Sequence, residues 1–128
     1  SEATPHPVIH LMLSQHHVTH KGASMRLGAY DCVLKDGTKS FHAYGEGNVS
    51  ERHRHRFEVN NAYRDQLENA GMIISGASPD NELVEMVEIA DHPWFVATQA
   101  HPEFKSRVAR THPLFKDFVK ASLHFKNQ

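Results

Sequence analysis

Apolar and polar residues alternate over short stretches from residue 25 onward, which predicts a chain built mainly of β-strands. Residues 25–35 are rich in apolar and aromatic side chains and end at Asp36-Gly37. That pair is typical of a hairpin turn, because both residues tolerate positive φ. We therefore expect a strand over residues 25–35 and a partner strand over Ser40–Tyr44, which ends before Gly45.

The run ERHRHRFEVN at residues 51–60 alternates most clearly. Successive side chains of a strand point to opposite faces, so a period of two divides this run between a basic face and a second face. The basic face would hold Arg52, Arg54, Arg56 and Glu58, and the other face would hold His53, His55, Phe57 and Val59.

A helix is predicted after this strand. Asn60 or Asn61 can cap its N-terminus, and Tyr63, Leu67 and Ala70 follow at helical spacing up to Gly71. Residues 72–75 and 83–89 then predict two strands joined by a turn over residues 78–81.

The last third of the chain predicts one more strand and one more helix. Residues 94–99 form a short apolar run that suits a strand buried on both faces. Thr111 can cap a final helix, whose apolar side chains form a single stripe that must pack on something. The stripe consists of Leu114, Phe115, Phe118, Val119 and Leu123.

These elements predict an α/β fold in which a mixed β-sheet carries flanking helices. Residues 1–24 are expected to form a loop or connector with one short apolar run at 8–13, and residues 25–128 the strands and helices. The buried strand and the helix stripe need more cover than 128 residues provide. Because the chain also starts at Ser1 without a methionine, we expect it to be the C-terminal portion of a domain whose other half lies upstream.

Composition excludes several classes of protein. Lysine and arginine number 14 and aspartate and glutamate 15, and a net charge of −1 argues against nucleic-acid binding through phosphates. No apolar run approaches the length that spans a membrane. The single cysteine excludes an internal disulfide framework and fits a reducing, cytoplasmic setting.

His101 and Glu103 are the first candidates for chemistry. A histidine base works best beside a carboxylate that sets its tautomer, and residues i and i+2 leaving a strand point the same way. The sequence leaves open a simpler interpretation, in which both residues lie in a surface turn.

The basic face of residues 51–60 is the second candidate. Clustered guanidinium groups match an anionic ligand such as a carboxylate or phosphate, although charges on an edge strand can also serve only to prevent aggregation. His53 and His55 could bind a metal, but the sequence shows no third ligand, and we predict no metal site.

Cys32 is a poor nucleophile candidate. It lies within a strand pattern between Asp31 and Val33, without the glycine-flanked elbow that exposes a catalytic cysteine. A buried structural thiol is the better interpretation. The pair His101 and Glu103 would then have no nucleophile within these 128 residues.

Six runs together resemble one enzyme family, in order and over nearly the whole chain. They are TPHPVIHLM, KGASMRLGAY, ERHRHRFEVNN, SGASPDNELVEMVE, DHPWFVATQAHPEFKSR and HPLFKDFVKAS. They closely resemble the C-terminal half of the class I glutamine amidotransferase domain of CTP synthases. HPEF is shared across the class I amidotransferases, whereas ERHRHRFEVN is specific to CTP synthases among them.

The resemblance implies a function and site roles. CTP synthases convert UTP to CTP with ATP and with ammonia that a Cys-His-Glu triad releases from glutamine. His101 would be the triad base and Glu103 its carboxylate. Arg56 and the backbone at Phe57 would hold the glutamine substrate, and Arg26 would be linked to activation by GTP.

The resemblance also implies what lies outside the chain. No cofactor is expected here, and Mg and ATP belong to the absent synthase domain, which would be a partner of this chain within a homo-oligomeric enzyme. The catalytic cysteine would lie upstream, so the chain alone should be inactive. The alternative is a non-catalytic fragment or a binding and assembly module that acts only with a partner.

Overall fold

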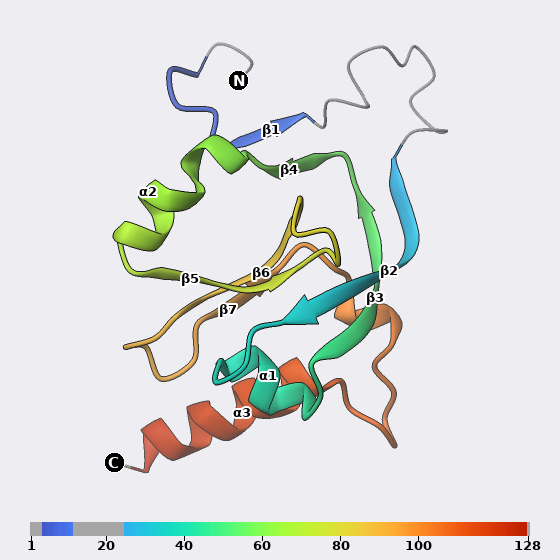
Figure 1. Cartoon of the computed structure of the whole chain (residues 1–128). Coiled ribbons are helices and arrows are strands. Elements are labelled where there is room, and N and C mark those ends of the chain that lie inside the picture. The colour runs from blue at the N-terminus through green and yellow to red at the C-terminus, as the bar shows by residue number, and fades with distance from the viewer. Residues whose placement is uncertain (1–3, 12–24, 128) are drawn as a thin grey trace.

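The computed structural model describes residues 4–11 and 25–127 (Figure 1). A two-stranded sheet pairs β1 (Ile9–Leu11) with β4 (Phe57–Val59). A five-stranded sheet has the order β3-β2-β5-β6-β7. Its strands are β2 (Arg26–Leu34), β3 (Asn48–His55), β5 (Met72–Ala77), β6 (Val84–Ile89) and β7 (Val96–Thr98). The helices are α1 (Lys39–Tyr44), α2 (Arg64–Asn69) and α3 (Pro113–Lys126), with 3₁₀ turns η2 (Asn61–Tyr63) and η3 (Pro102–Phe104).

This arrangement confirms the α/β fold class. Every strand pairing within the described residues is antiparallel. The expected loop over residues 1–24 falls mostly on residues 1–3 and 12–24, which lie outside the described ranges, while β1 occupies part of the expected apolar run. Each helix in the described part of the chain is too short or too polar to span a lipid bilayer.

The long ribbon of β2 and β3 connects the two sheets. Its register runs from Arg26 opposite His55 to Val33 opposite Asn48. Only Val33 and Leu34 also pair with β5. The rest of the ribbon therefore extends beyond β5, β6 and β7 toward β4 and β1 (Figure 1).

The prediction of a partner strand over Ser40–Tyr44 was wrong, because these residues belong to α1. Asp36-Gly37 does form a turn, but Thr38 then caps a helix by accepting a hydrogen bond from the Phe41 N–H (3.2 Å). The buried carboxylate of Glu88 accepts the Lys39 and Ser40 N–H groups at 2.9 and 3.1 Å. These bonds satisfy the first N–H groups of the helix, so a distant residue decides the local structure.

The ERHRHRFEVN run is not one strand, because it breaks at Arg56 and changes its partner from β2 to β1. The predicted alternation holds within β3, where Arg52 and Arg54 are exposed and His53 is buried. After the break, the alternation of exposed and buried side chains starts again with the two faces exchanged. Glu58 turns inward with 2% of its surface exposed, so the prediction that it shares a face with the arginines was wrong.

Two later predictions also need correction. β7 is an edge strand with one exposed and two half-buried residues, not a strand buried on both faces. α3 is capped by His112, whose side chain accepts the Leu114 N–H, rather than by Thr111. The predicted cap at Asn60, the turn over residues 78–81 and the strands on either side of that turn are confirmed.

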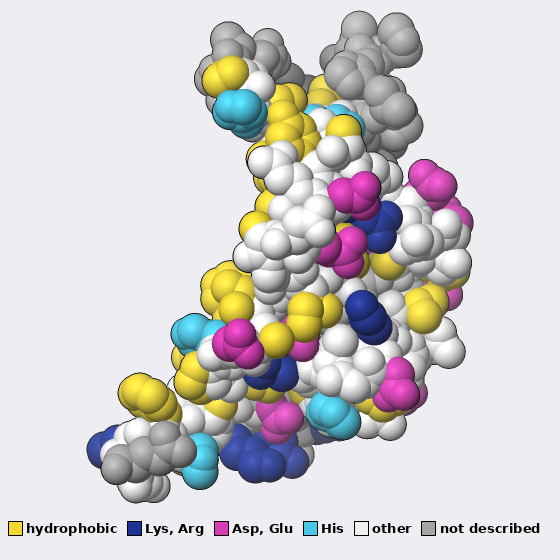
Figure 2. Space-filling view, turned by 60° about the vertical axis from the view of Figure 1, so that its left-hand side comes forward, with side chains coloured by type: hydrophobic (Ala, Val, Ile, Leu, Met, Phe, Trp, Pro, Cys, Tyr) yellow, Lys and Arg dark blue, Asp and Glu magenta, His cyan; other side chains and the backbone are white. Residues whose placement is uncertain are grey.

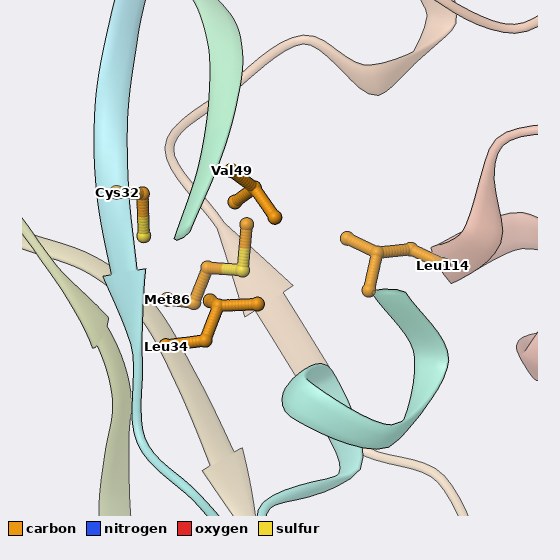
Figure 3. Close-up of a cluster of buried hydrophobic side chains, with 5 residues drawn as sticks. All are labelled: Cys32, Leu34, Val49, Met86 and Leu114. Carbon is orange, nitrogen blue, oxygen red and sulfur yellow. The ribbon is translucent and has the colours of Figure 1, made fainter. Parts of the chain in front are cut away.

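The hydrophobic core lies between the five-stranded sheet and the helices α1 and α3. Figure 3 shows its buried side chains, which are Cys32, Leu34, Val49, Met86 and Leu114. Gly76 on β5 makes this packing feasible, because a Cβ there would lie 2.8 Å from the Cys32 sulfur.

Most of the predicted α3 stripe is not covered by described residues. Leu114 is buried, whereas Phe118, Val119 and Leu123 are exposed. Figure 2 shows hydrophobic side chains among the charged ones on a face that includes the C-terminal end of the chain. The stripe thus exists as predicted, and Leu114 is its one member that packs into the core.

Candidate functional site

His101 and Glu103 lie together where the chain leaves β7. His101 immediately precedes the 3₁₀ turn η3, and its Nδ1 lies 2.7 Å from Oε1 of Glu103. The hydrogen bond from His101 holds the pKa of the Glu103 carboxyl below its usual value. The predicted juxtaposition is therefore present, formed within a turn instead of along an extended strand.

This hydrogen bond determines which ring nitrogen of His101 can act as a base. An ionised carboxylate only accepts hydrogen bonds, so Nδ1 carries the proton and Nε2 keeps its lone pair. No described residue forms a hydrogen bond with Nε2, and the side chain is 35% exposed. The ring stacks on Phe104, with centroids 5.2 Å apart. The arrangement suits a general base whose reactive nitrogen faces outward.

The main chain of His101 is held against β3. Its N–H donates to the Arg52 carbonyl at 2.7 Å. Gln99 lies two residues earlier. When its amide nitrogen faces the neighbouring acceptors, it donates to Glu58 and to the Val84 carbonyl (2.9 Å). The segment that follows β7 is thus hydrogen-bonded to β3 and β4, the two strands that carry the arginine-rich run.

A second cluster, which the sequence analysis did not predict, centres on Glu51. This carboxylate is 1% exposed and accepts hydrogen bonds from His112 Nε2 (2.8 Å) and Tyr44 Oη (3.0 Å). Lys105, just after η3, lies 3.6 Å away. Burial alone would raise the pKa of Glu51, but His112, Lys105 and Tyr44 together lower it. The cluster therefore joins β3 to α1, to the residue after η3 and to the N-terminus of α3.

The only sequence signal for this cluster was alternation. Glu51 falls on the same face of β3 as His53, and His53 is buried. A carboxylate on a buried face must have partners, but those partners come from α1 and from the segment before α3, and spacing along the chain does not identify them.

Arg56 and Phe57 lie at the bend between β3 and β4. Arg56 is half-buried, and within the described ranges its side chain forms no hydrogen bond or ion pair. The Phe57 side chain is exposed, and its carbonyl oxygen lies 3.1 Å from His55 Nδ1. Arg52 and Arg54 are exposed on β3. The three arginines therefore do not form one continuous face, and only Arg56 lies at the bend.

Arg26, by contrast, is buried with 5% of its surface exposed. Its guanidinium pairs with Glu85, lies 3.6 Å from Glu58 and covers the Tyr30 ring at 4.4 Å. The positive charge of Arg26 is thus shared by two buried carboxylates. A role of Arg26 in activation by a nucleotide stays a prediction.

The groups around Arg26 have displaced pKa values. Burial raises the pKa of Glu58 to about 7, against the opposing effect of Arg26. Burial, together with the charges of Arg26 and His55, lowers the pKa of His53 to about 4. His53 is therefore neutral near pH 7, and Glu58 titrates there.

Cys32 is buried with 1% of its surface exposed, and burial raises its thiol pKa to about 12. A neutral, enclosed thiol is a poor nucleophile, which agrees with the structural role predicted for Cys32. No group of three or more His, Cys, Asp or Glu side chains suited to a metal ion occurs in the part of the chain that the structure describes.

Comparison with known proteins shows which family this chain is similar to. Residues 4–121 match the family described as glutamine amidotransferase class-I. The chain belongs to the class-I glutamine amidotransferase family. The expected resemblance is thereby confirmed at the level of the family.

Within that family the chain is similar to CTP synthases. It is 60% identical over 119 residues to the CTP synthase of Moorella thermoacetica, a match that covers 93% of this chain and 22% of that protein. It is 58% identical over 123 residues to the CTP synthase of Caldanaerobacter subterraneus subsp. tengcongensis, covering 96% and 23%. The chain thus spans about a fifth of the length of these relatives.

A solved structure agrees with the sequence comparison. The glutaminase domain of Trypanosoma brucei CTPS, with bound acivicin, matches with a TM-score of 0.87 and 33% identity. The match covers 96% of this chain and 48% of that domain. The amidotransferase fold described here is therefore similar to about half of a glutaminase domain.

Proposed function

We propose that this chain is part of a CTP synthase and forms the half of its glutaminase domain that carries the histidine base and its carboxylate. The 2.7 Å contact between His101 and Glu103 carries this proposal, because it leaves Nε2 of the histidine basic and exposed. The similarity to CTP synthases over nearly the whole chain supports the choice of enzyme.

In the proposed reaction, His101 Nε2 accepts the proton of a cysteine thiol, and the thiolate attacks the side-chain amide carbon of glutamine. The histidine then gives that proton to the departing nitrogen, which leaves as ammonia. Water hydrolyses the remaining thioester to glutamate. Glu103 holds the ring in the required tautomer and stabilises the imidazolium while it exists.

The proposal assigns glutamine binding to the bend at Arg56. Because no described residue pairs with the Arg56 guanidinium, this group can form a charge-assisted, bidentate contact with the α-carboxylate of an amino acid. The Phe57 backbone would complete this subsite. The two segments that carry the base and the arginine are neighbours, since the His101 N–H donates to the Arg52 carbonyl.

The nucleophile has to come from outside these 128 residues, because Cys32 is their one cysteine and is buried. We expect the chain alone to be inactive for that reason. The remainder of the enzyme would supply the synthase domain, to which we assign Mg and ATP. The described residues contain no acidic cluster that fits the metal, and no step of the glutaminase reaction passes through it.

The test uses the complete protein that contains this chain and compares glutamine with ammonia as nitrogen donor. His101→Ala should abolish glutamine-dependent CTP formation, and Arg56→Ala should raise the KM for glutamine, while synthesis from ammonia continues in both. His42→Ala, at an exposed histidine on α1, is the matched control. Glutamine use that survives His101→Ala would refute the assignment of the base.

The alternative is a non-catalytic binding or assembly module. It predicts that the chain hydrolyses no glutamine by itself and that glutaminase activity is found only after a partner chain is added. An intact mass measured under denaturing conditions shows at the outset which length of chain is under study.

A further inference from the structure

His55 provides a hydrogen bond across the bend that carries Arg56. Its Nδ1 lies 3.1 Å from the carbonyl oxygen of Phe57, so side chain 55 and backbone 57 close a small ring around residue 56. The other nitrogen of the His55 imidazole, Nε2, lies 2.8 Å from Nδ1 of His53. His53 is buried on β3, with 2% of its surface exposed.

The protons of this pair can be assigned from their partners. A carbonyl oxygen only accepts hydrogen bonds, so His55 Nδ1 must carry the proton. In a neutral ring Nε2 is then an acceptor, and His53 Nδ1 must donate to it. The hydrogen bonds therefore run in one direction, from buried His53 through His55 to the Phe57 carbonyl.

We propose that His55 is a positioning residue for the amino-acid substrate, because its Nδ1–H holds the Phe57 carbonyl and thereby fixes the bend that directs Arg56. This inference rests on the proposed function, in which Arg56 binds the α-carboxylate of glutamine. His55 itself does not touch the substrate in this scheme.

The strand pairings explain why the bend needs such a bond. His55 is the last residue of β3 and pairs with Arg26 of β2, whereas Phe57 is the first residue of β4 and pairs with Leu11 of β1. Residue 56 belongs to neither ladder. The backbone at Arg56 would therefore be free to rotate at the point where two sheets separate, and the His55 bond restrains it.

The surroundings of His55 favour the neutral ring, whose Nε2 can accept the hydrogen bond from His53. Four titratable or charged groups face it: Arg26 on β2, His53 on β3, Glu58 on β4 and His101 beyond β7. Burial, followed by the charges of Arg26 and His101, lowers the pKa of His55, although its bond to Phe57 opposes this. Glu58 Oε1 lies 3.4 Å from His55 Nδ1, and the two side chains would form an ion pair only if the imidazole were charged.

Two substitutions of similar size separate the hydrogen bond from packing. In His55→Asn, the side-chain amide places an N–H near the position of Nδ1 and can still donate to the Phe57 carbonyl. In His55→Leu, the side chain fills a similar space and cannot donate. His42→Asn and His42→Leu, at an exposed histidine on α1, are the matched controls.

The experiment measures kcat and KM for glutamine, and the rate with ammonia, in the complete protein. His55→Leu should raise the KM for glutamine about tenfold, the effect of losing one positioning hydrogen bond, with a much smaller change in kcat. His55→Asn should restore the KM to within about threefold of the wild-type value, since the donor is restored.

Three results would overturn the inference. They are an unchanged KM in His55→Leu, an equal loss in His55→Asn and His55→Leu, and an equal loss of glutamine-driven and ammonia-driven synthesis, which would indicate misfolding instead of mispositioning. If the wild-type protein uses no glutamine, or Arg56→Ala has no effect on it, the proposed function fails and the inference fails with it. If Arg56→Ala acts as expected and His55→Leu does not, the inference alone fails.

Discussion

Replacing Glu58 by Gln and His53 by Asn should separate two opposing pH dependences of folding stability. Both side chains are buried, each with 2% of its surface exposed, and they flank the guanidinium of Arg26. Both replacements are close in shape to the original side chain and do not titrate. The measured quantity is the free energy of unfolding as a function of pH.

The sign of each effect follows from proton binding. Burial raises the pKa of Glu58 from 4.5 to about 7, so between these values the folded protein binds more protons than the unfolded chain. Its contribution to stability is complete below pH 4.5 and is lost as the pH rises to about 7. The pKa of His53 falls from 6.5 to about 4, so its contribution is complete above pH 6.5 and is lost as the pH falls to about 4.

The two contributions are of similar size. Each pKa moves by about 2.5, and one pKa unit corresponds to about 1.4 kcal/mol, so each group changes the free energy of unfolding by about 3 kcal/mol. In the wild-type chain the two slopes nearly cancel between about pH 4.5 and 6.5. With Glu58→Gln, stability should rise with pH across this window, and with His53→Asn it should fall.

Urea denaturation at closely spaced pH values measures these curves. The fluorescence of Trp94 reports unfolding, because it is the one tryptophan of the sequence and packs against the core cluster. Glu46→Gln is the control, since it removes the same charge from an exposed position. Slopes of the same sign in the two variants, or curves identical to that of the wild type, would refute the reasoning.

Three further predictions concern the base, the core and the thiol. Glu103→Gln should lower glutamine-dependent kcat by about 10² to 10⁴, as expected when the group that orients a base is lost, and a normal rate would count against the pair. Gly76→Ala should destabilise the chain by about 1 to 3 kcal/mol in urea denaturation, because the new methyl group would lie 2.8 Å from the Cys32 sulfur. Gly47→Ala, whose nearest contact would be an ordinary 3.5 Å, is its control and should be no less stable than the wild type. Iodoacetamide should alkylate Cys32 only in denaturant, and rapid alkylation of the folded chain at pH 8 would contradict its burial and its pKa of about 12.

Features that depend on neighbouring residues could be predicted from the sequence. The cap at Asn60, which accepts the Ala62 N–H at 3.1 Å, needs only a local side chain. The contact between His101 and Glu103 also joins near neighbours in the sequence, although the turn η3, and not an extended strand, brings the two side chains together. The helix end at Gly71 agrees with its φ of 96°.

Features that depend on distant partners could not be predicted in this way. The segment over Ser40–Tyr44 becomes a helix because Glu88, far along the chain, accepts its first N–H groups. The arginine-rich run breaks because its two halves pair with different strands. The local sequence of these segments does not identify either partner. The hairpin-turn signal at Asp36-Gly37 and the alternation at residues 51–60 therefore predicted strands.

Residue types and short spacings are enough to predict the fold class, the family resemblance and the candidates His101, Glu103 and Arg56. Which charges are buried, and what they contact, became known from the folded chain. Glu51, Glu58 and Glu85 are fully enclosed carboxylates whose partners come from separate elements. A buried charge persists only where such partners converge, and that convergence is a property of the folded chain.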